Sequence, residues 1–189
     1  MPFANHFPNV SNVSTLAQTV GLWVGQTRLR GIQSPGVQFI PERVKVVYVN
    51  EKYFHNYTWA VKRYGRKSGY YLNIEATIKK EWNNNVTFNL IFNEFLHNEY
   101  RRSFVELHYK FCDLLKNEKF IGHRVLEYGI KCPLVADTYR FMNLTIPLEE
   151  FPSVFPYERA RIDIEYTITN TSESMSKVYL YCTFKKIRV

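Results

Sequence analysis

From residue 40 onward, apolar and polar side chains alternate along most of the chain with a period of two residues. The segment 70–80 is the clearest case, because apolar residues take every second position from Leu72 to Ile78. Successive side chains of a strand point to opposite faces of a sheet, so this period predicts half-buried strands. The pattern predicts strands at 43–49, 56–61, 70–80, 86–93, 104–111, 139–146, 161–169 and 178–189.

Short polar segments separate several of these strands, notably 83–85 and 170–176. Strands joined by such turns favour an antiparallel sandwich or barrel, so the predicted class is all-β. Between Cys112 and Cys132 the alternation stops, and leucines lie among charged residues before Gly129. This change of pattern predicts a short helical insert between the two cysteines.

The composition supports one β-rich domain. Hydrophobic residues make up 46% of the 189 positions and aromatic residues 16%, which suits pleated, half-buried surfaces. Residues 1–37 are rich in Asn, Ser, Gln and Gly, and we expect them to form a loosely ordered N-terminal extension. Residues 38–189 are the expected sandwich domain, and they contain no internal repeat.

The chain carries a net charge of +8, and its densest basic run is Lys62–Lys67. No run of five like charges and no RNA-binding signature occurs, so we expect no nucleic-acid partner. The basic run is interpreted first as a solvated hairpin tip. Attraction to an anionic lipid or an acidic sugar surface is the alternative.

Three cysteines are present, and none forms the C-x-x-C pair of common zinc and redox sites. Cys112 and Cys132 flank the helical insert, so in an oxidising compartment we expect them to be bonded and Cys182 to be unpaired. This bridge would close a loop of about 20 residues and stabilise the fold by roughly 3 kcal/mol. Three reduced cysteines in a cytosolic protein are the alternative.

Glycosylation sequons are more frequent than chance allows. Six occur, against about two expected from the numbers of Asn, Ser and Thr. The excess predicts a secreted glycoprotein, modified at some of four sites within the domain. These are Asn56, Asn85, Asn143 and Asn170; Asn9 and Asn12 carry the other two sequons.

The N-terminal residues do not add to the case for secretion. The apolar run 20–25 is short and interrupted by glycine, so it is not a convincing signal peptide. No stretch approaches the 18 or so apolar residues of a membrane span, and we expect a protein that does not cross a membrane.

Catalytic motifs are missing from the sequence. Its five histidines form no H-E-x-x-H, and no G-x-S-x-G, phosphate loop or dinucleotide fingerprint occurs. We therefore expect no enzyme activity, no metal and no cofactor. Glu106 and His108 share one face of a predicted strand. They are interpreted as part of a solvated face, with an acid–base pair as the alternative.

The order of motifs carries a resemblance. Phe111-Cys112-Asp113-Leu114-Leu115 precedes the insert, and Ile130-Lys131-Cys132-Pro133-Leu134 follows it. A Tyr-x-Phe-x-Asn strand at 139–143 and a proline-punctuated segment at 151–157 come next. Over roughly residues 38–189 this order resembles a large insect family of small secreted proteins related to the ML lipid-recognition domain. That superfamily also holds the ganglioside activator and the lysosomal sterol carrier, and some insect members are chemosensory proteins of pheromone or taste perception.

The resemblance implies an immunoglobulin-like sandwich of two antiparallel sheets, splayed to leave an apolar cavity, with no catalytic residue and no metal. The chain departs from the pattern at three points. Its N-terminal residues give no convincing leader. The first strands have no cysteine to pair with Cys182, and residues 156–159 lack a glycine before the strand that follows.

Two functions remain open. The first is non-catalytic binding of a lipid-like or other apolar small molecule between the sheets, in a chemosensory role that the resemblance suggests. The second is a secreted interaction module with a filled core, which recognises a membrane receptor or a glycan through its surface. For the first, the candidate cavity-lining residues are the inward positions of five strands: Leu72, Ile74, Phe88, Leu90, Phe92, Leu107, Tyr109, Ile164, Tyr166 and Leu180.

Overall fold

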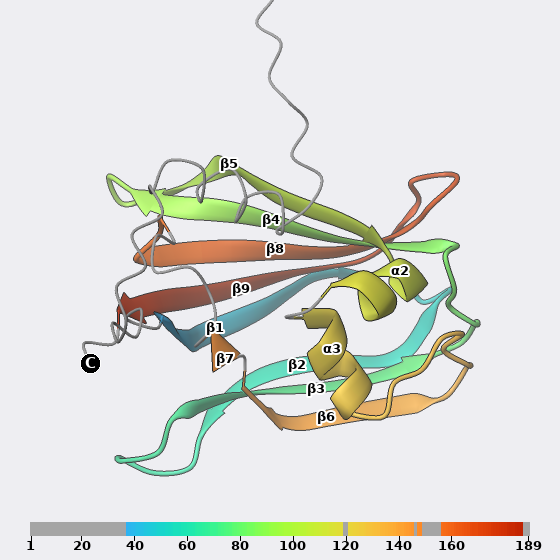
Figure 1. The fold of residues 1–189 in the computed structure, drawn as a ribbon, viewed down its shortest axis with the longest axis horizontal. Coiled ribbons are helices and arrows are strands. Elements are labelled where there is room, and N and C mark those ends of the chain that lie inside the picture. Colours follow the sequence, from blue (N-terminus) through green and yellow to red (C-terminus); the bar gives the residue numbers. More distant parts are fainter. Residues whose placement is uncertain (1–36, 119–120, 146, 149–155, 187–189) are drawn as a thin grey trace, which may run out of the picture. The chain divides into compact units, whose positions relative to one another are not determined.

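Two antiparallel sheets of unequal width pack against each other in the computed structural model (Figure 1). It describes residues 37–118, 121–145, 147–148 and 156–186, all within one unit, Ser34–Val189. The expected N-terminal extension lies outside the described residues except for Val37, which begins the first strand. The elements are β1 (Val37–Val49), β2 (Phe54–Arg63), β3 (Tyr70–Ile78), β4 (Val86–Leu96), β5 (Glu99–Lys110), α2 (Phe111–Asn117), α3 (Ile121–Glu127), β6 (Thr138–Leu144), β7 (Pro147–Leu148), β8 (Arg159–Ile168) and β9 (Ser174–Lys186).

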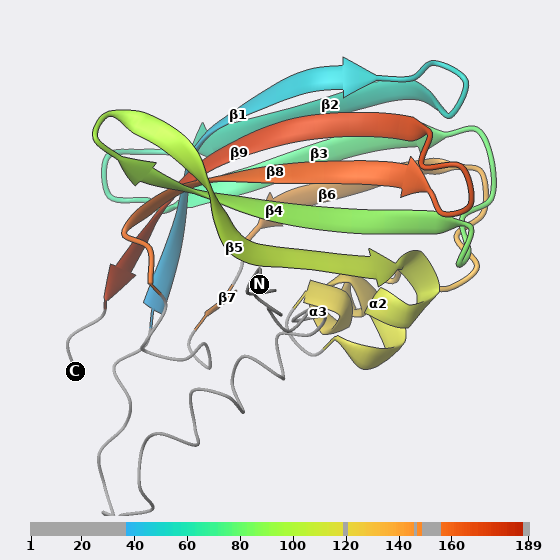
Figure 2. The same cartoon turned by 90° about the horizontal axis from the view of Figure 1, so that it is seen from above.

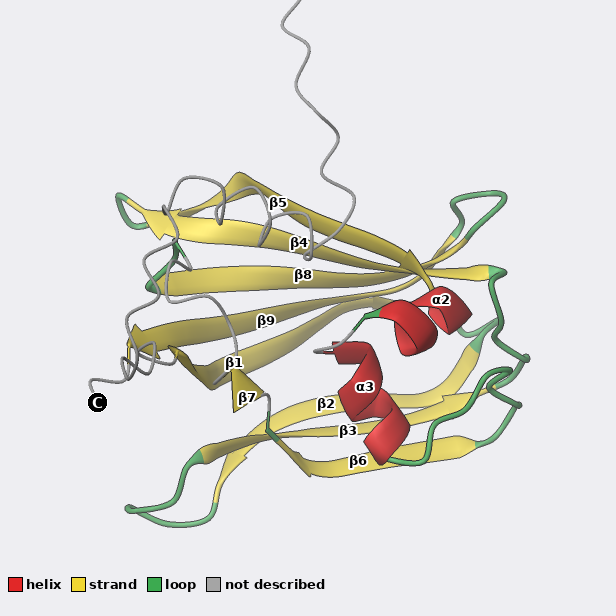
Figure 3. Cartoon of the chain, viewed as in Figure 1, coloured by secondary structure: helices red, strands yellow, loops and turns green. Residues whose placement is uncertain are grey.

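The larger sheet has the strand order β5-β4-β8-β9-β1-β7, and the smaller sheet has the order β2-β3-β6. Every neighbouring pair in both sheets is antiparallel. The predicted all-β sandwich with a short helical insert is therefore confirmed, and Figure 3 shows how little of the described chain is helical.

The predicted alternation holds best in the centre of the larger sheet. Leu90 of β4 lies opposite Leu107 of β5 on one side and Ile164 of β8 on the other, and all three are buried. Strand β1 begins six residues earlier than expected. It pairs with β9 from Val37 through a register shift between Pro41 and Arg43, and such a bulge interrupts the strict period on which the sequence prediction relied.

A hydrophobic core joins the smaller sheet to the end of the larger sheet where the helices lie. Trp82 is at its centre, with its ring 5.7 Å from Phe54, 5.4 Å from Phe111 and 5.0 Å from Tyr166. The buried members of the core are Tyr53, Phe54, Ala76, Ile78, Trp82, Val86, Phe111, Leu115, Ile130, Leu134 and Met175.

The helical insert lies beside β5 of the larger sheet and β6 of the smaller one (Figure 2). Leu114 and Leu115 of α2 are buried, and Tyr128, just after α3, places its ring 5.7 Å from Phe141 of β6. Gly129 then adopts a φ of 80°, which favours glycine and ends the helical segment.

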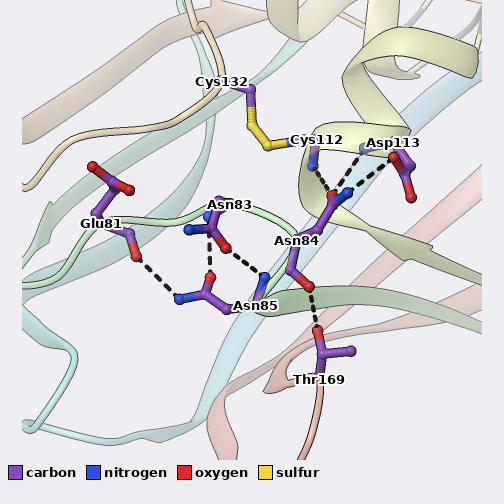
Figure 4. The surroundings of a disulfide bond; sticks show 8 residues. All are labelled: Glu81, Asn83, Asn84, Asn85, Cys112, Asp113, Cys132 and Thr169. Carbon is purple, nitrogen blue, oxygen red and sulfur yellow. Dashed lines mark hydrogen bonds between the residues drawn. A yellow bond between two sulfur atoms is a disulfide. The ribbon is translucent and has the colours of Figure 1, made fainter.

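Phe111 corrects the sequence prediction, because it begins α2 and does not continue the strand. The reason is a cap supplied by another segment (Figure 4). Lys110, at the N-cap position, makes no capping bond with its own side chain. Asn84 Oδ1 instead accepts hydrogen bonds from the backbone N–H groups of Cys112 (3.0 Å) and Asp113 (3.3 Å). These are donors that a first helical turn leaves unsatisfied.

The disulfide Cys112–Cys132 joins the start of α2 to the segment after α3, as predicted (Figure 4). Cys182, in β9, is buried and lies outside any disulfide. Its environment strongly raises the pKa of the thiol, chiefly through desolvation, so Cys182 behaves as an apolar core residue.

Asn84→Ala should test the cap. We expect it to lower the free energy of unfolding by about 1–2 kcal/mol, because two backbone donors of α2 lose their acceptor. Urea unfolding of the oxidised protein, followed by tryptophan fluorescence, measures the change. Asn117→Ala, on an exposed position at the end of α2, is the control and should stay within about 0.5 kcal/mol of wild type. Equal effects for the two variants would contradict the role given to Asn84.

Candidate functional site

The inner faces of the two sheets form the candidate site. On the larger sheet, Phe88 lies opposite Tyr109 and Tyr166, and the next inward pair along β8 and β9 is Ile164 with Val178. On the smaller sheet, Ile74 of β3 lies opposite Trp59 of β2 on one side and Phe141 of β6 on the other. Two apolar surfaces from different parts of the chain therefore face the same interior.

The structure places the ten predicted lining residues on these two faces. Leu72 and Ile74 belong to the smaller sheet and the other eight to the larger one. Ile74 and Tyr166 are only partly buried. The remaining eight are between 2% and 9% exposed: Leu72, Phe88, Leu90, Phe92, Leu107, Tyr109, Ile164 and Leu180.

The aromatic side chains of β2 and β6 were absent from the predicted set. Tyr57 and Trp59 of β2 lie opposite Ala76 and Ile74, so they share the inner face, as does Phe141 of β6. Alternation of aromatic residues at 57 and 59 was visible in the sequence. A register shift between Phe54 and Tyr57 hid which of the two faces is the buried one.

One row across the middle of the smaller sheet differs from its surroundings. Trp59, Ile74 and Phe141 lie side by side on β2, β3 and β6, and each of them is only partly buried. Tyr57, the next inward residue of β2, is also partly buried, with its ring 6.1 Å from that of Trp59. We call Tyr57, Trp59, Ile74 and Phe141 the central patch.

Few polar atoms reach this interior. The Tyr57 hydroxyl accepts a hydrogen bond of 3.1 Å from Ser176 Oγ, and Ser176 is fully buried. Desolvation raises the pKa of Tyr57 to about 12, although Ser176 and Trp59 lower it in part. Desolvation likewise raises the pKa of Tyr166, with a smaller contribution from Tyr57. Both phenols are therefore neutral at any physiological pH.

Two indole N–H groups in the interior have no hydrogen-bond partner at normal geometry. Trp59 Nε1 lies close enough to the Tyr57 hydroxyl to lower its pKa, but it forms no hydrogen bond of normal geometry. Trp82 Nε1 is also buried and unpaired. Buried donors usually have a partner, so these two nitrogens are exceptions within the interior.

The alternative acid–base pair lies on the opposite, outer face of β5. His108 Nε2 is 3.4 Å from Glu106 Oε2, but Arg102 Nη2 donates to the same oxygen at 2.8 Å. The hydrogen bond from Arg102 holds the pKa of Glu106 below its ordinary value. A general acid or base needs a pKa near the working pH, but the pKa of Glu106 is moved further below that pH. The geometry is that of an ion-paired strand face.

Three further features concern metal binding, membrane crossing and glycosylation. Among the described residues, no group of three or more His, Cys, Asp or Glu side chains is placed to hold a metal ion. None of the helices in the described part of the chain is long and apolar enough to cross a membrane. The four sequon asparagines predicted to carry glycans, Asn56, Asn85, Asn143 and Asn170, are all exposed.

Tyr57→Phe should test the polar part of the interior. It removes the hydrogen-bond partner of the buried Ser176 hydroxyl, so we expect the free energy of unfolding to fall by about 1 kcal/mol at pH 8. The raised pKa of Tyr57 contributes stability that is complete below about pH 10 and is lost as the pH rises toward 12. Stability of the variant should therefore fall less steeply than that of wild type between these two values.

Urea unfolding at pH 8, 10 and 11 measures both effects. Tyr48→Phe, on an exposed side chain, is the control for the loss of a tyrosine hydroxyl. If Tyr57→Phe and wild type lost stability in parallel above pH 10, the assignment of this titration to Tyr57 would be wrong.

No protein-family model matches the chain, and no curated protein is detectably similar to it in sequence.

Proposed function

We propose that this protein binds one apolar small molecule between its two sheets and does not act on it chemically. The observation that carries the proposal is the accessible surface left on the central patch. Its members occupy inward positions halfway along the smaller sheet, with Ile74 on the central strand β3 between aromatic residues of the edge strands β2 and β6, and all four keep part of their accessible surface. The facing residues Leu90 and Ile164 are 5% and 6% exposed.

The tyrosines support an interior in which polar groups are shielded from bulk water. Burial is the largest influence on the pKa of both Tyr57 and Tyr166, so protein surrounds their hydroxyls. Both residues nevertheless keep part of their accessible surface. The accessible part of these rings offers an apolar contact surface, and a ring-lined interior suits an apolar ligand.

The chemistry of the lining describes the ligand. Burial contributes about 0.8 kcal/mol per methylene, so a chain of about sixteen methylenes gains about 13 kcal/mol. An association cost of about 5 kcal/mol leaves micromolar affinity. Fatty acids, their esters and terpenoids are apolar molecules of this kind, and the resemblance to insect chemosensory proteins favours a semiochemical.

A secreted location goes with this proposal. The disulfide Cys112–Cys132 requires an oxidising compartment to persist, and the four sequon asparagines are accessible to glycosylation. An extracellular carrier of an apolar molecule would hand its ligand to a membrane receptor, which is the partner we propose.

A second candidate function rests on the outer face of the larger sheet. Arg43 lies over the ring of Tyr181 at 4.1 Å, and Arg161 lies over that of Tyr179 at 4.2 Å. Arginine and tyrosine are enriched at the centres of protein interfaces. This face would serve an interaction module with a filled core, and it would bind its partner whether or not the interior takes a ligand.

Ile74→Trp should separate the two functions. On the central patch, the larger side chain should fill the space, weaken binding of a fluorescent fatty acid at least tenfold, and change stability little. The milder Ile74→Phe should give an intermediate loss of binding. Fluorescence titration, with displacement by unlabelled fatty acid, measures affinity, and thermal unfolding measures stability.

Leu90→Trp is the matched control, because Leu90 is an aliphatic inward residue of the facing sheet but is tightly packed. We expect it to cost about 1–3 kcal/mol by overpacking. If wild type binds no apolar probe, and Ile74→Trp destabilises the protein as much as Leu90→Trp does, the interior is filled and the interaction module becomes the better proposal.

Glycosylation tests the secreted location separately. Protein from a eukaryotic secretory host should lose mass on enzymatic removal of N-glycans, and Gln variants of Asn56, Asn85, Asn143 and Asn170 should identify the occupied sites. Asn117→Gln, outside any sequon, should leave the glycan pattern unchanged. An unchanged mass after enzyme treatment would remove the main support for secretion.

A further inference from the structure

The turn between β2 and β3 is the most concentrated basic feature of the described surface. Lys62, Arg63, Arg66 and Lys67 lie within six residues of one another, and all four are exposed. The chain has no acidic residue between positions 52 and 74. We call the segment 62–71 the basic hairpin; it also includes Tyr64, Tyr70 and Tyr71.

Contacts within the turn hold the basic hairpin in one shape. Arg63 donates from Nε to the backbone oxygen of Ser68 at 3.2 Å and from Nη2 to that of Arg66. Ser68 Oγ donates to the backbone oxygen of Gly65 at 3.0 Å and accepts from the backbone N–H of Tyr64. Arg63 therefore positions the turn, and the turn presents the remaining cations.

Those remaining cations have no ionic partner among the residues that the structure describes. In the part of the chain that the structure describes, no carboxylate lies within ion-pair distance of Lys62, Arg66 or Lys67. Some basic residues elsewhere are paired, as Lys177 is with Glu165 and Arg161 with Asp163. Three unpaired cations on a rigid turn attract an external anion.

The aromatic rings indicate what kind of anion fits. Tyr64 and Tyr71 have ring centroids 5.7 Å apart, and Arg63 lies over the ring of Tyr70. The Tyr64 hydroxyl donates to Asn143 Oδ1 at 2.7 Å, which ties this ring to β6. The rings thus lie along the hairpin, where their exposed faces can pack against the flat C–H faces of sugar rings.

A membrane is the poorer fit. A surface-bound segment buries large apolar side chains in the lipid, and the tip of the basic hairpin, residues 65–69, contains only Gly, Arg, Lys and Ser. The sequon residue Asn143, which accepts the bond from Tyr64, would place a glycan beside the hairpin and hold a bilayer away. A hydrated polymer of sulfated or carboxylated sugars needs no apolar side chains at the tip.

Two further cations lie at the same end of the sandwich. Strand β9 runs antiparallel to β1, so it ends where β1 begins, which is also the end where β2 turns into β3 (Figure 1). Its last residues, Lys185 and Lys186, are exposed. A linear polyanion bound to the hairpin therefore finds positive charge beyond it.

We propose that the basic hairpin binds a linear anionic polysaccharide, with Lys62, Arg66 and Lys67 contacting its sulfate or carboxylate groups. Such a site would hold the protein in an extracellular matrix or at a cell coat. It is independent of the apolar ligand, because the two sites share no residue.

The test compares two triple variants with the same change in net charge. The first is Lys62→Gln/Arg66→Gln/Lys67→Gln, which keeps Arg63 and with it the shape of the turn. The second, Lys45→Gln/Lys110→Gln/Lys131→Gln, removes three exposed lysines from other parts of the domain. Surface plasmon resonance on immobilised heparin fragments of defined length measures affinity at several salt concentrations, and thermal unfolding checks that both variants fold.

We expect the hairpin variant to bind heparin at least tenfold more weakly at 150 mM salt, and its slope of log affinity against log salt to fall by two to three, about one for each cation removed. The control variant should stay within about twofold of wild type. Both variants should keep the wild-type affinity for a fluorescent fatty acid, so failure of the proposed lipid-binding function would not affect this result.

Three outcomes would overturn the proposal. Equal losses in the two triple variants would show that heparin responds only to net charge. No measurable binding of wild type at 150 mM salt would remove the site altogether. Stronger binding to vesicles containing phosphatidylserine than to heparin, abolished by the hairpin variant, would assign the hairpin to a membrane.

Discussion

The unequal width of the two sheets is the constraint on which the rest of this structure depends. The larger sheet presents an apolar inner face on β4, β5, β8, β9 and β1, and the smaller sheet has three strands with which to cover it. Apolar surface of that extent is not left in water, because its burial is the main driving force of folding. The helical insert supplies part of the missing cover beside β5 and β6. The disulfide and the cap from Asn84 fix the insert in place, and Trp82 packs where it meets both sheets.

The local alternation of apolar and polar residues predicted the strands at the centre of the fold. It could not predict the changes of register between strands. Strands β4, β8 and β9 follow the period of two, so Leu90, Ile164 and Leu180 were identified as inward residues and are buried. The bulge beside Pro41 hid the first part of β1, and the shift after Phe54 hid the inward direction of Tyr57 and Trp59. Phe111 continues the alternation of β5 but is helical, because the cap comes from a residue 28 positions away that no local pattern reveals.

The interior and the surface of the protein suit different kinds of ligand. The proposed site between the sheets is lined by rings and has few polar atoms, so it would select for size and apolar character with little demand on shape. The basic hairpin is charged and exposed, so it would select for charge. A protein that holds an apolar molecule inside and a polyanion outside would keep a poorly soluble ligand at a fixed place in a hydrated matrix.

Native mass spectrometry of the protein purified from a eukaryotic secretory host tests the central claim, an occupied interior, most directly. The account predicts a species heavier than the glycosylated polypeptide by one small molecule, which disappears after extraction with organic solvent and returns on incubation with a mixture of fatty acids and terpenoids. A mass explained by polypeptide and glycans alone, unchanged by that incubation, would contradict it.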